Sequence, residues 1–168
     1  MLDMPLSVGD RAPDFKLPST EGGHFHLEGD HKGKSLLIYF YPKDFTPGCT
    51  AQACSFRDSL DLFRDADIPV VGISQDDIAT HKRFQEAHKL SFPLLSDAQG
   101  DVAQKYDARV PLIRFTRRIT YLLDTEHRIA AVYENLMRSR RHVEEMQKHI
   151  QSGLLTDRAR QKAASNRK

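Results

Sequence analysis

The chain has 168 residues, of which 39% are hydrophobic and 29% charged, and its formal net charge is +2 at pH 7. This length and composition suit one globular domain, and the near-neutral charge gives no indication of nucleic-acid binding. No apolar run is long enough to cross a membrane. The first residues lack a secretory signal and two cysteines are too few for a secreted scaffold, so we expect a cytoplasmic protein.

The first predicted elements are a β-hairpin and a buried strand. Residues 15–17 and 24–27 alternate apolar and polar side chains, and the Glu-Gly-Gly sequence between them is a turn signal. The continuous apolar run at residues 36–40 then predicts a strand that is buried on both faces. Pro42 ends this strand.

Both cysteines of the chain lie in the next predicted element, a helix. Pro47 and Gly48 open this helix, which we expect to extend to about Ala66, because proline is favoured in the first helical turn. Cys49 would lie where backbone N–H groups have no partner within the helix. The partial positive charge there favours a thiolate, the nucleophilic form of cysteine. The sequence therefore predicts a reactive Cys49, with a buried, inert thiol as the alternative.

Cys54 follows Cys49 by five residues. On a regular helix this spacing places the two Cα atoms roughly 8–9 Å apart, beyond the ~7 Å limit for a disulfide. A disulfide between the two cysteines therefore requires the first turns of the helix to unwind. The alternative for Cys54 is a core position on an apolar stripe with Phe56 and Leu60.

Strands and helices alternate along the rest of the chain. In chain order the predicted elements are a strand at 68–74, a helix at 78–89, a strand and turn at 92–97, a helix at 102–106, a hairpin of 118–123 with 129–133, and an amphipathic helix at 140–150. We place one domain at residues 1–153 and a basic, disordered tail at residues 154–168.

This order of elements predicts an α/β fold with a mixed central sheet flanked by helices and an N-terminal β-hairpin. Ligands of such sheets bind at the carboxyl ends of the strands. Cys49 follows the strand at 36–40 and therefore falls at such an edge. The eight histidines and two cysteines show no metal-ligand spacing, so no metal site is expected.

Three segments of the chain resemble the peroxiredoxins. Residues 8–15, Val-Gly-Asp-Arg-Ala-Pro-Asp-Phe, are similar to the opening of these proteins, and residues 40–50 match their Pro-x-x-x-Thr-x-x-Cys motif. Cys54, followed by Ser-Phe-Arg-Asp, is similar to the bacterioferritin-comigratory, or Q-type, subfamily. Residues 118–124, Arg-Ile-Thr-Tyr-Leu-Leu-Asp, match a later segment of that subfamily. The resemblance covers about residues 8–150 and implies a thioredoxin-like fold.

The resemblance also implies a thiol-dependent reduction of hydrogen peroxide or organic hydroperoxides. It makes Cys49 the peroxidatic cysteine and Cys54 the resolving cysteine, with thioredoxin or a similar dithiol protein as the reductant. By the same resemblance, Pro42 shields Cys49 from solvent, and Thr46 and Arg118 bind and polarise the peroxide. No flavin, haem or metal cofactor is implied.

The residue types are consistent with this chemistry. A thiolate that attacks an O–O bond becomes a sulfenic acid and expels water or an alcohol. Negative charge develops on the leaving oxygen, so hydrogen-bond donors directed at it lower the barrier. The Thr46 hydroxyl, the Cys49 N–H and the Arg118 guanidinium are candidate donors, and the charge of Arg118 would also favour the thiolate. Cys54 can then condense with the sulfenic acid to a disulfide that an external dithiol reduces.

The basic segment at residues 108–117 departs from the subfamily pattern, because it is shorter and lacks a Met-Tyr-Gly-Lys-like stretch. Arg114 and Arg117 in this segment compete with Arg118 for the catalytic assignment. We assign Arg118 because its spacing to the strand that follows matches the subfamily. Two structural alternatives stay open: Thr46 is a good helix cap, and Arg118 could be an ordinary cation at the start of a strand.

Two other functions remain open at this point. A thioredoxin-like disulfide reductase or isomerase would be expected to carry a Cys-x-x-Cys motif, which the chain lacks. A peroxide-sensing redox protein would be oxidised once without turnover. Because the predicted cysteine pair lies within one chain, we expect a monomer.

Overall fold

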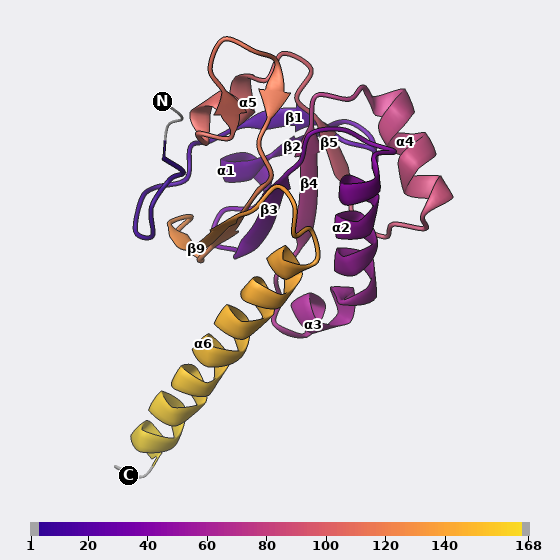
Figure 1. Cartoon of the computed structure of the whole chain (residues 1–168). Coiled ribbons are helices and arrows are strands. Elements are labelled where there is room, and N and C mark those ends of the chain that lie inside the picture. The colour runs from indigo at the N-terminus through magenta and orange to yellow at the C-terminus, as the bar shows by residue number, and fades with distance from the viewer. Residues whose placement is uncertain (1–3, 166–168) are drawn as a thin grey trace.

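The computed structural model describes residues 4–165, with side chains described as far as residue 153 (Figure 1). Its centre is a five-stranded sheet with the order β5-β4-β3-β8-β9. The strands are β3 (Leu36–Phe40), β4 (Val70–Ser74), β5 (Leu94–Ser96), β8 (Ile119–Leu123) and β9 (Ile129–Glu134). β3, β4 and β5 are parallel, whereas β8 is antiparallel to both β3 and β9. The predicted mixed sheet is therefore confirmed.

Helices and a hairpin cover the two faces of this sheet (Figure 1). One face packs against α2 (Pro47–Asp58), α3 (Leu60–Asp65), α4 (Ile78–Ala87) and α6 (Arg141–Ser165). The other face packs against α1 (Leu27–Asp30), α5 (Asp101–Lys105) and a hairpin of β1 (Lys16–Pro18) with β2 (His24–His26). The hairpin predicted near the N-terminus is present and forms a separate two-stranded sheet.

β3 contributes to both apolar cores. Its side chains alternate, so that Leu36, Ile38 and Phe40 join the core on the hairpin side, and Leu37 and Tyr39 join the core on the α2 side. All five residues are fully buried. This double burial is what the continuous apolar run in the sequence predicts.

The helix predicted from Pro47 to Ala66 is wrong in one respect, because it breaks at Ser59. This residue has φ −105° and ψ 7°, and it separates α2 from α3. Asp58 and Ser59 are both weak helix formers whose side chains compete for backbone groups. α3 is therefore a separate short helix, and it buries Leu60 and Phe63.

Two further segments differ from the predicted elements. Residues 27–30 form α1 in place of the end of a strand. The basic segment at 108–117 contains a small hairpin of β6 (Arg109–Val110) with β7 (Phe115–Thr116). Leu112 and Ile113 at its tip are exposed. No strand was expected there, because each strand is only two residues long.

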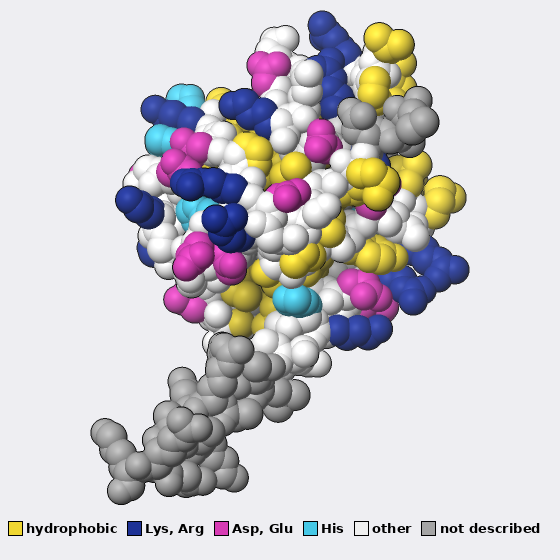
Figure 2. Space-filling view, turned by 90° about the vertical axis from the view of Figure 1, so that its left-hand side faces the viewer, with side chains coloured by type: hydrophobic (Ala, Val, Ile, Leu, Met, Phe, Trp, Pro, Cys, Tyr) yellow, Lys and Arg dark blue, Asp and Glu magenta, His cyan; other side chains and the backbone are white. Residues whose placement is uncertain are grey.

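The last helix is longer than the amphipathic pattern predicts. α6 continues through Ser165, whereas side chains beyond Gly153 and residues 166–168 lie outside the described part of the structure. The domain boundary at residue 153 and the disordered tail stay predictions. Among the described residues, no helix is long and apolar enough to cross a membrane. The face in Figure 2 carries basic and acidic side chains interspersed.

The sheet topology brings several loops to one edge. The parallel strands β3, β4 and β5 all end there, at Phe40, Ser74 and Ser96. β8 begins at the same edge, because Ile119 pairs with Phe40. The loop that leads into α2 and the residue before β8, Arg118, therefore lie beside each other.

Candidate active site

Cys49 lies in the first turn of α2, two residues after Pro47. Its side chain is 1% exposed and joins the apolar core that contains Tyr39 and Tyr41. The N–H groups of this turn have no partner within the helix, and the turn contains no acidic side chain that would offset their partial positive charge. The backbone position predicted for a reactive cysteine is therefore present.

Arg118 contacts the sulfur of Cys49. Its Nη2 donates to Sγ at 3.2 Å, its Nη1 donates to Oε1 of Gln52 at 2.6 Å, and its Nε donates to the Leu136 carbonyl at 3.1 Å. The guanidinium is buried, since Arg118 is 4% exposed. Of these three acceptors, only the Cys49 sulfur can carry a negative charge. The buried guanidinium thus places a positive charge within hydrogen-bond distance of this sulfur.

The two competing arginines point elsewhere. Arg114 is exposed on the β6–β7 hairpin segment. Arg117 forms an ion pair with Glu134 at 2.5 Å and donates to the Asp107 carbonyl at 2.8 Å. The geometry therefore favours Arg118 among the three arginines considered from the sequence.

Gln52 belongs to the site, although the sequence argument did not include it. It is fully buried, its Oε1 accepts from Arg118, and its Nε2 has no hydrogen-bond partner among the described residues. Gln52 follows Cys49 by three residues and so lies on the same face of α2. A polar side chain on the buried face of this helix is the signal that could have identified it.

Thr46 occupies the N-cap position of α2 with φ −90° and ψ 150°. Its side chain does not cap the helix, because the hydroxyl donates to the Lys43 carbonyl at 2.8 Å. The capping alternative for this side chain is therefore wrong. With its proton committed to Lys43, the Thr46 oxygen is left as an acceptor for an incoming hydroxyl group.

Pro42 directly follows Tyr41 and is half-buried at the start of the loop that leads to Thr46. This position is compatible with a role in limiting water at the sulfur. That role stays a prediction.

A shallow depression of about 390 Å³ borders the first turns of α2. Its lining includes Gly48 and Ala51 of α2 and three arginines, Arg138, Arg140 and Arg141. A β-carbon at Gly48 would lie 3.0 Å from Nη2 of Arg118, so a larger residue would press on the guanidinium. The glycine thus allows Arg118 to reach the sulfur.

Cys54 lies on α2 and is half-buried, whereas Phe56 and Leu60 are buried. Both cysteines are free thiols, and the helix is continuous from Pro47 to Asp58. The helical spacing therefore keeps the two sulfur-bearing residues apart in this conformation. A bond between them requires α2 to open.

His142 supports the segment that holds Arg118. Its Nε2 donates to the Asn135 carbonyl at 2.8 Å, and its Nδ1 accepts from the Thr120 hydroxyl at 2.8 Å. Burial lowers the pKa of His142 to about 4, so the ring is neutral at pH 7. The neighbouring Leu136 supplies the carbonyl that fixes Nε of Arg118.

One group of potential metal ligands occurs among the described residues. It consists of Asp44, Asp76 and His81, whose ligand atoms lie within 4.8 Å of one another. These atoms are engaged in hydrogen bonds, including the one between Asp44 Oδ2 and His81 Nδ1. The group is therefore satisfied within the protein.

Comparison with known proteins identifies relatives along most of the chain. The model of the AhpC/TSA family matches residues 8–132. A protein of Coxiella burnetii named as a bcp peroxiredoxin is 43% identical over 136 residues, which cover 77% of this chain and 89% of that protein. The chloroplastic peroxiredoxin Q of Suaeda salsa is 42% identical over 150 residues, which cover 88% of this chain and 69% of that protein.

A solved structure agrees with the fold as well. The crystal structure of the peroxidoxin BcpB of Mycobacterium tuberculosis matches with a TM-score of 0.81 and 31% identity, covering 89% of this chain and 98% of the other. The thioredoxin-like architecture expected from the sequence is thereby confirmed. The chain belongs to the AhpC/TSA family, and within it to the Bcp or Q-type peroxiredoxins, which makes it a thiol-dependent peroxidase.

Proposed function

We propose that Cys49 is the nucleophile of this peroxidase. The observation that carries the proposal is the 3.2 Å contact between Arg118 Nη2 and the Cys49 sulfur, made inside the protein with both residues almost fully buried. The thiolate attacks one oxygen of the hydroperoxide, an S–O bond forms and the O–O bond breaks. The products are a sulfenic acid on Cys49 and an alkoxide or hydroxide, which becomes an alcohol or water by taking up the proton released when the thiol ionised.

The groups around the sulfur have separate tasks in this step. Arg118 stabilises the thiolate before the attack and the charge on the leaving oxygen during it. The Thr46 oxygen accepts from the hydroxyl group of the hydroperoxide and orients the substrate. Gln52 keeps the guanidinium in place through its 2.6 Å hydrogen bond, and Pro42 limits the access of water.

Cys54 resolves the sulfenic acid in the next step. Its sulfur attacks the sulfur of Cys49, an S–S bond forms, and the hydroxyl group leaves as water. The 1% exposure of Cys49 and the continuous helix both require the first turns of α2 to open for this attack. An external dithiol such as thioredoxin then reduces the disulfide by two exchange steps.

Hydrogen peroxide and organic hydroperoxides are both proposed substrates. Because the two cysteines lie on one helix, no second subunit is needed, and the proposed state is a monomer. The proposed location is the cytoplasm. Several relatives, including the one from Suaeda salsa, are chloroplastic by name, so cell fractionation is the appropriate check of that last point.

Peroxide consumption coupled to thioredoxin and its reductase tests the proposal. Cys49→Ser should abolish turnover. Cys54→Ser should react once with peroxide and then fail to be recycled efficiently. Normal turnover by Cys49→Ser would contradict the proposal.

The same preparations separate the two alternative functions. Reduction of insulin disulfides without peroxide turnover would indicate a disulfide reductase. A single oxidation of the wild-type protein without recycling would indicate a peroxide sensor.

A further inference from the structure

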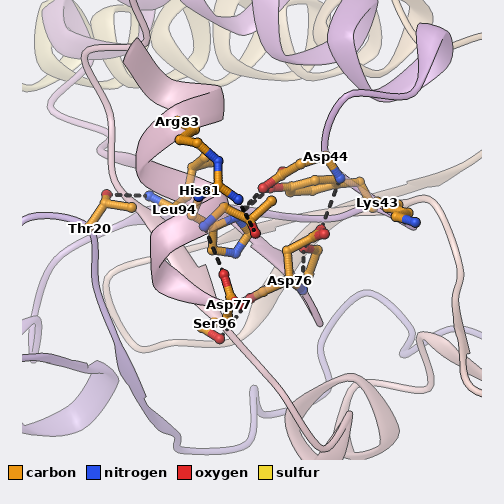
Figure 3. A network of polar contacts seen from close by, with 12 residues as sticks. Thr20, Lys43, Asp44, Asp76, Asp77, His81, Arg83, Leu94 and Ser96 are labelled. Carbon is orange, nitrogen blue, oxygen red and sulfur yellow. Dashed lines mark hydrogen bonds and ion pairs between the residues drawn. The ribbon is translucent and has the colours of Figure 1, made fainter. Parts of the chain in front are cut away.

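A buried hydrogen-bond network joins the loop between β3 and α2 to α4. The side chains of Asp44, in the loop between β3 and α2, and of His81, on α4, are both fully buried. His81 Nδ1 lies 2.6 Å from Asp44 Oδ2. Figure 3 shows Asp44, Asp76 and His81 meeting between the loop and the helix. None of these residues contacts the Cys49 sulfur.

The partners of His81 determine where its protons lie. Nε2 faces the Leu95 carbonyl at 3.0 Å, and a carbonyl only accepts, so this nitrogen carries hydrogen. One further proton lies between Nδ1 and Asp44. The other carboxylate oxygen accepts from the Tyr41 hydroxyl at 2.6 Å. Burial raises the pKa of Tyr41 well above its ordinary value, so this hydroxyl keeps its proton and donates.

The loop that Asp44 fastens is strained. Phe45, the next residue, has φ +62°, which is unfavourable for a residue with a β-carbon. Such a conformation persists only where the surroundings impose it. Asp44 imposes it from one side, through His81 and through its N–H, which donates to Asp76 Oδ2 at 2.9 Å. The Phe45 ring packs edge-on against Phe84 of α4, with 5.1 Å between ring centroids.

Thr46 follows this strained residue directly. Its backbone begins α2, and its hydroxyl is directed by the Lys43 carbonyl, which immediately precedes Asp44. A shift of Asp44 therefore displaces the bond that orients the Thr46 hydroxyl. Arg118 reaches Cys49 from a different segment and depends on Gln52 and Leu136 instead.

We propose that His81 is a positioning residue of the peroxidase: its hydrogen bond to Asp44 holds the loop so that Thr46 meets the hydroperoxide correctly. The proposal rests on the proposed roles of Cys49 and Thr46. It assigns to His81 the orientation of the substrate, whereas the supply of thiolate depends on Arg118. In His81 variants, the rate of Cys49 oxidation by peroxide should therefore fall while the general reactivity of the thiol stays the same.

Two substitutions of His81 distinguish its two hydrogen bonds. In His81→Asn, the amide nitrogen falls near the place of Nδ1 and can still donate to Asp44. In His81→Gln, the amide nitrogen falls near the place of Nε2 and can still donate to the Leu95 carbonyl. The measured quantities are the second-order rate constant of Cys49 oxidation by hydrogen peroxide in a single turnover and the rate of Cys49 alkylation by iodoacetamide, both in a Cys54→Ser background.

We expect His81→Gln to lower the oxidation rate constant about tenfold or more and to change the alkylation rate by less than about twofold, because a tenfold loss corresponds to about one hydrogen bond. His81→Asn should stay within about threefold of the parent in both measurements. Equal losses in the two variants, the reverse order, or a parallel fall in oxidation and alkylation would overturn the proposal.

Two further variants serve as controls. In Asp44→Asn, the amide oxygen can accept from Tyr41 while the amide nitrogen donates to an unprotonated Nδ1, so oxidation should be largely retained. A loss in Asp44→Asn as large as in His81→Gln would contradict positioning by this hydrogen bond. Leu60→Ala removes buried side chain from α3, at the far end of α2, and should lower stability without slowing oxidation.

If the Cys54→Ser parent itself is not oxidised by peroxide, the proposed function fails and the role of His81 fails with it. If the parent is oxidised and His81→Gln is oxidised equally fast, only the role of His81 fails.

Discussion

Two buried histidines, His81 on α4 and His142 on α6, are held in opposite ways. Both are fully buried. At 3.0 Å or less, His81 faces two acceptors, the Asp44 carboxylate and a carbonyl, so a proton is needed between the ring and Asp44, while the Tyr41 hydroxyl lies 3.4 Å from Nδ1. His142 faces one carbonyl and the Thr120 hydroxyl, which can donate, so the neutral ring satisfies both contacts.

The two histidines thus differ in their partner atoms although both are buried. On the His81 side, the hydrogen bond to Asp44 joins α4 to the loop that carries Thr46. On the His142 side, the ring is uncharged and leaves the positive charge of Arg118 next to the sulfur undisturbed. The contacts of each histidine and its neighbours can be removed by separate substitutions.

The largest effect on Cys49 oxidation is expected when the positive charge of Arg118 is removed. Arg118→Met keeps an unbranched side chain and loses the charge and all three hydrogen bonds. We expect the rate constant of Cys49 oxidation to fall about a hundredfold or more, as for the loss of a preorganised charged donor. Stopped-flow oxidation by hydrogen peroxide measures this change. Arg114→Met, at an exposed arginine, should leave the rate constant unchanged, and equal losses in both variants would contradict the assignment.

The second effect concerns acid stability on the His142 side. The folded-state pKa of about 4 lies below the ordinary value of 6.5, so the unfolded chain binds more protons between these values. The stabilising contribution is therefore complete above about pH 6.5 and is lost as the pH falls toward 4. The difference corresponds to about 3 kcal/mol in the free energy of unfolding.

Urea unfolding at pH 7 and at pH 4.5 measures this loss, with His142→Gln as the matched variant. The glutamine amide can still donate to the Asn135 carbonyl but does not titrate. Its free energy of unfolding should therefore fall less than that of the wild type over this pH interval. An equal fall in the two proteins would show that other groups carry the acid sensitivity.

The smallest effect is expected on the loop side. Thr46→Val removes one hydroxyl and keeps the shape of the side chain, so we expect about a tenfold loss in the rate constant of peroxide oxidation. Iodoacetamide alkylation of Cys49 should stay near its original rate, because Arg118 is untouched. Thr46→Ser should recover most of the oxidation rate. A Thr46→Val protein that reacts at the wild-type rate would remove Thr46 from the mechanism.

The sequence predicted the sheet, and the edge of it at which Cys49 lies, because strong local patterns define them. The run at residues 36–40 is apolar at every position, and the strand is buried on both faces. The break at Ser59 was missed because weak helix formers such as Asp58 and Ser59 mark a helix end less clearly than a proline or glycine does. The hairpin at residues 109–116 was missed because its two-residue strands leave no periodic pattern.

Local sequence patterns also indicated part of the candidate site. Cys49 follows from a proline-marked helix start that can be seen in the sequence, and the motif resemblance led to Arg118. The network around Asp44 and His81 joins residues 37 positions apart, and Gln52 and Arg118 are 66 positions apart. No local pattern indicates which buried polar side chains will meet across such separations, so these partners became visible only in the folded structure.

The most direct test is the mass of the protein after one equivalent of hydrogen peroxide, measured without reductant and followed by peptide mapping. We predict a loss of two hydrogen atoms per chain and a single linked peptide pair that joins Cys49 to Cys54. A stable gain of oxygen on either cysteine with no linked peptides, or a reacted Cys54 beside an unreacted Cys49, would contradict the account.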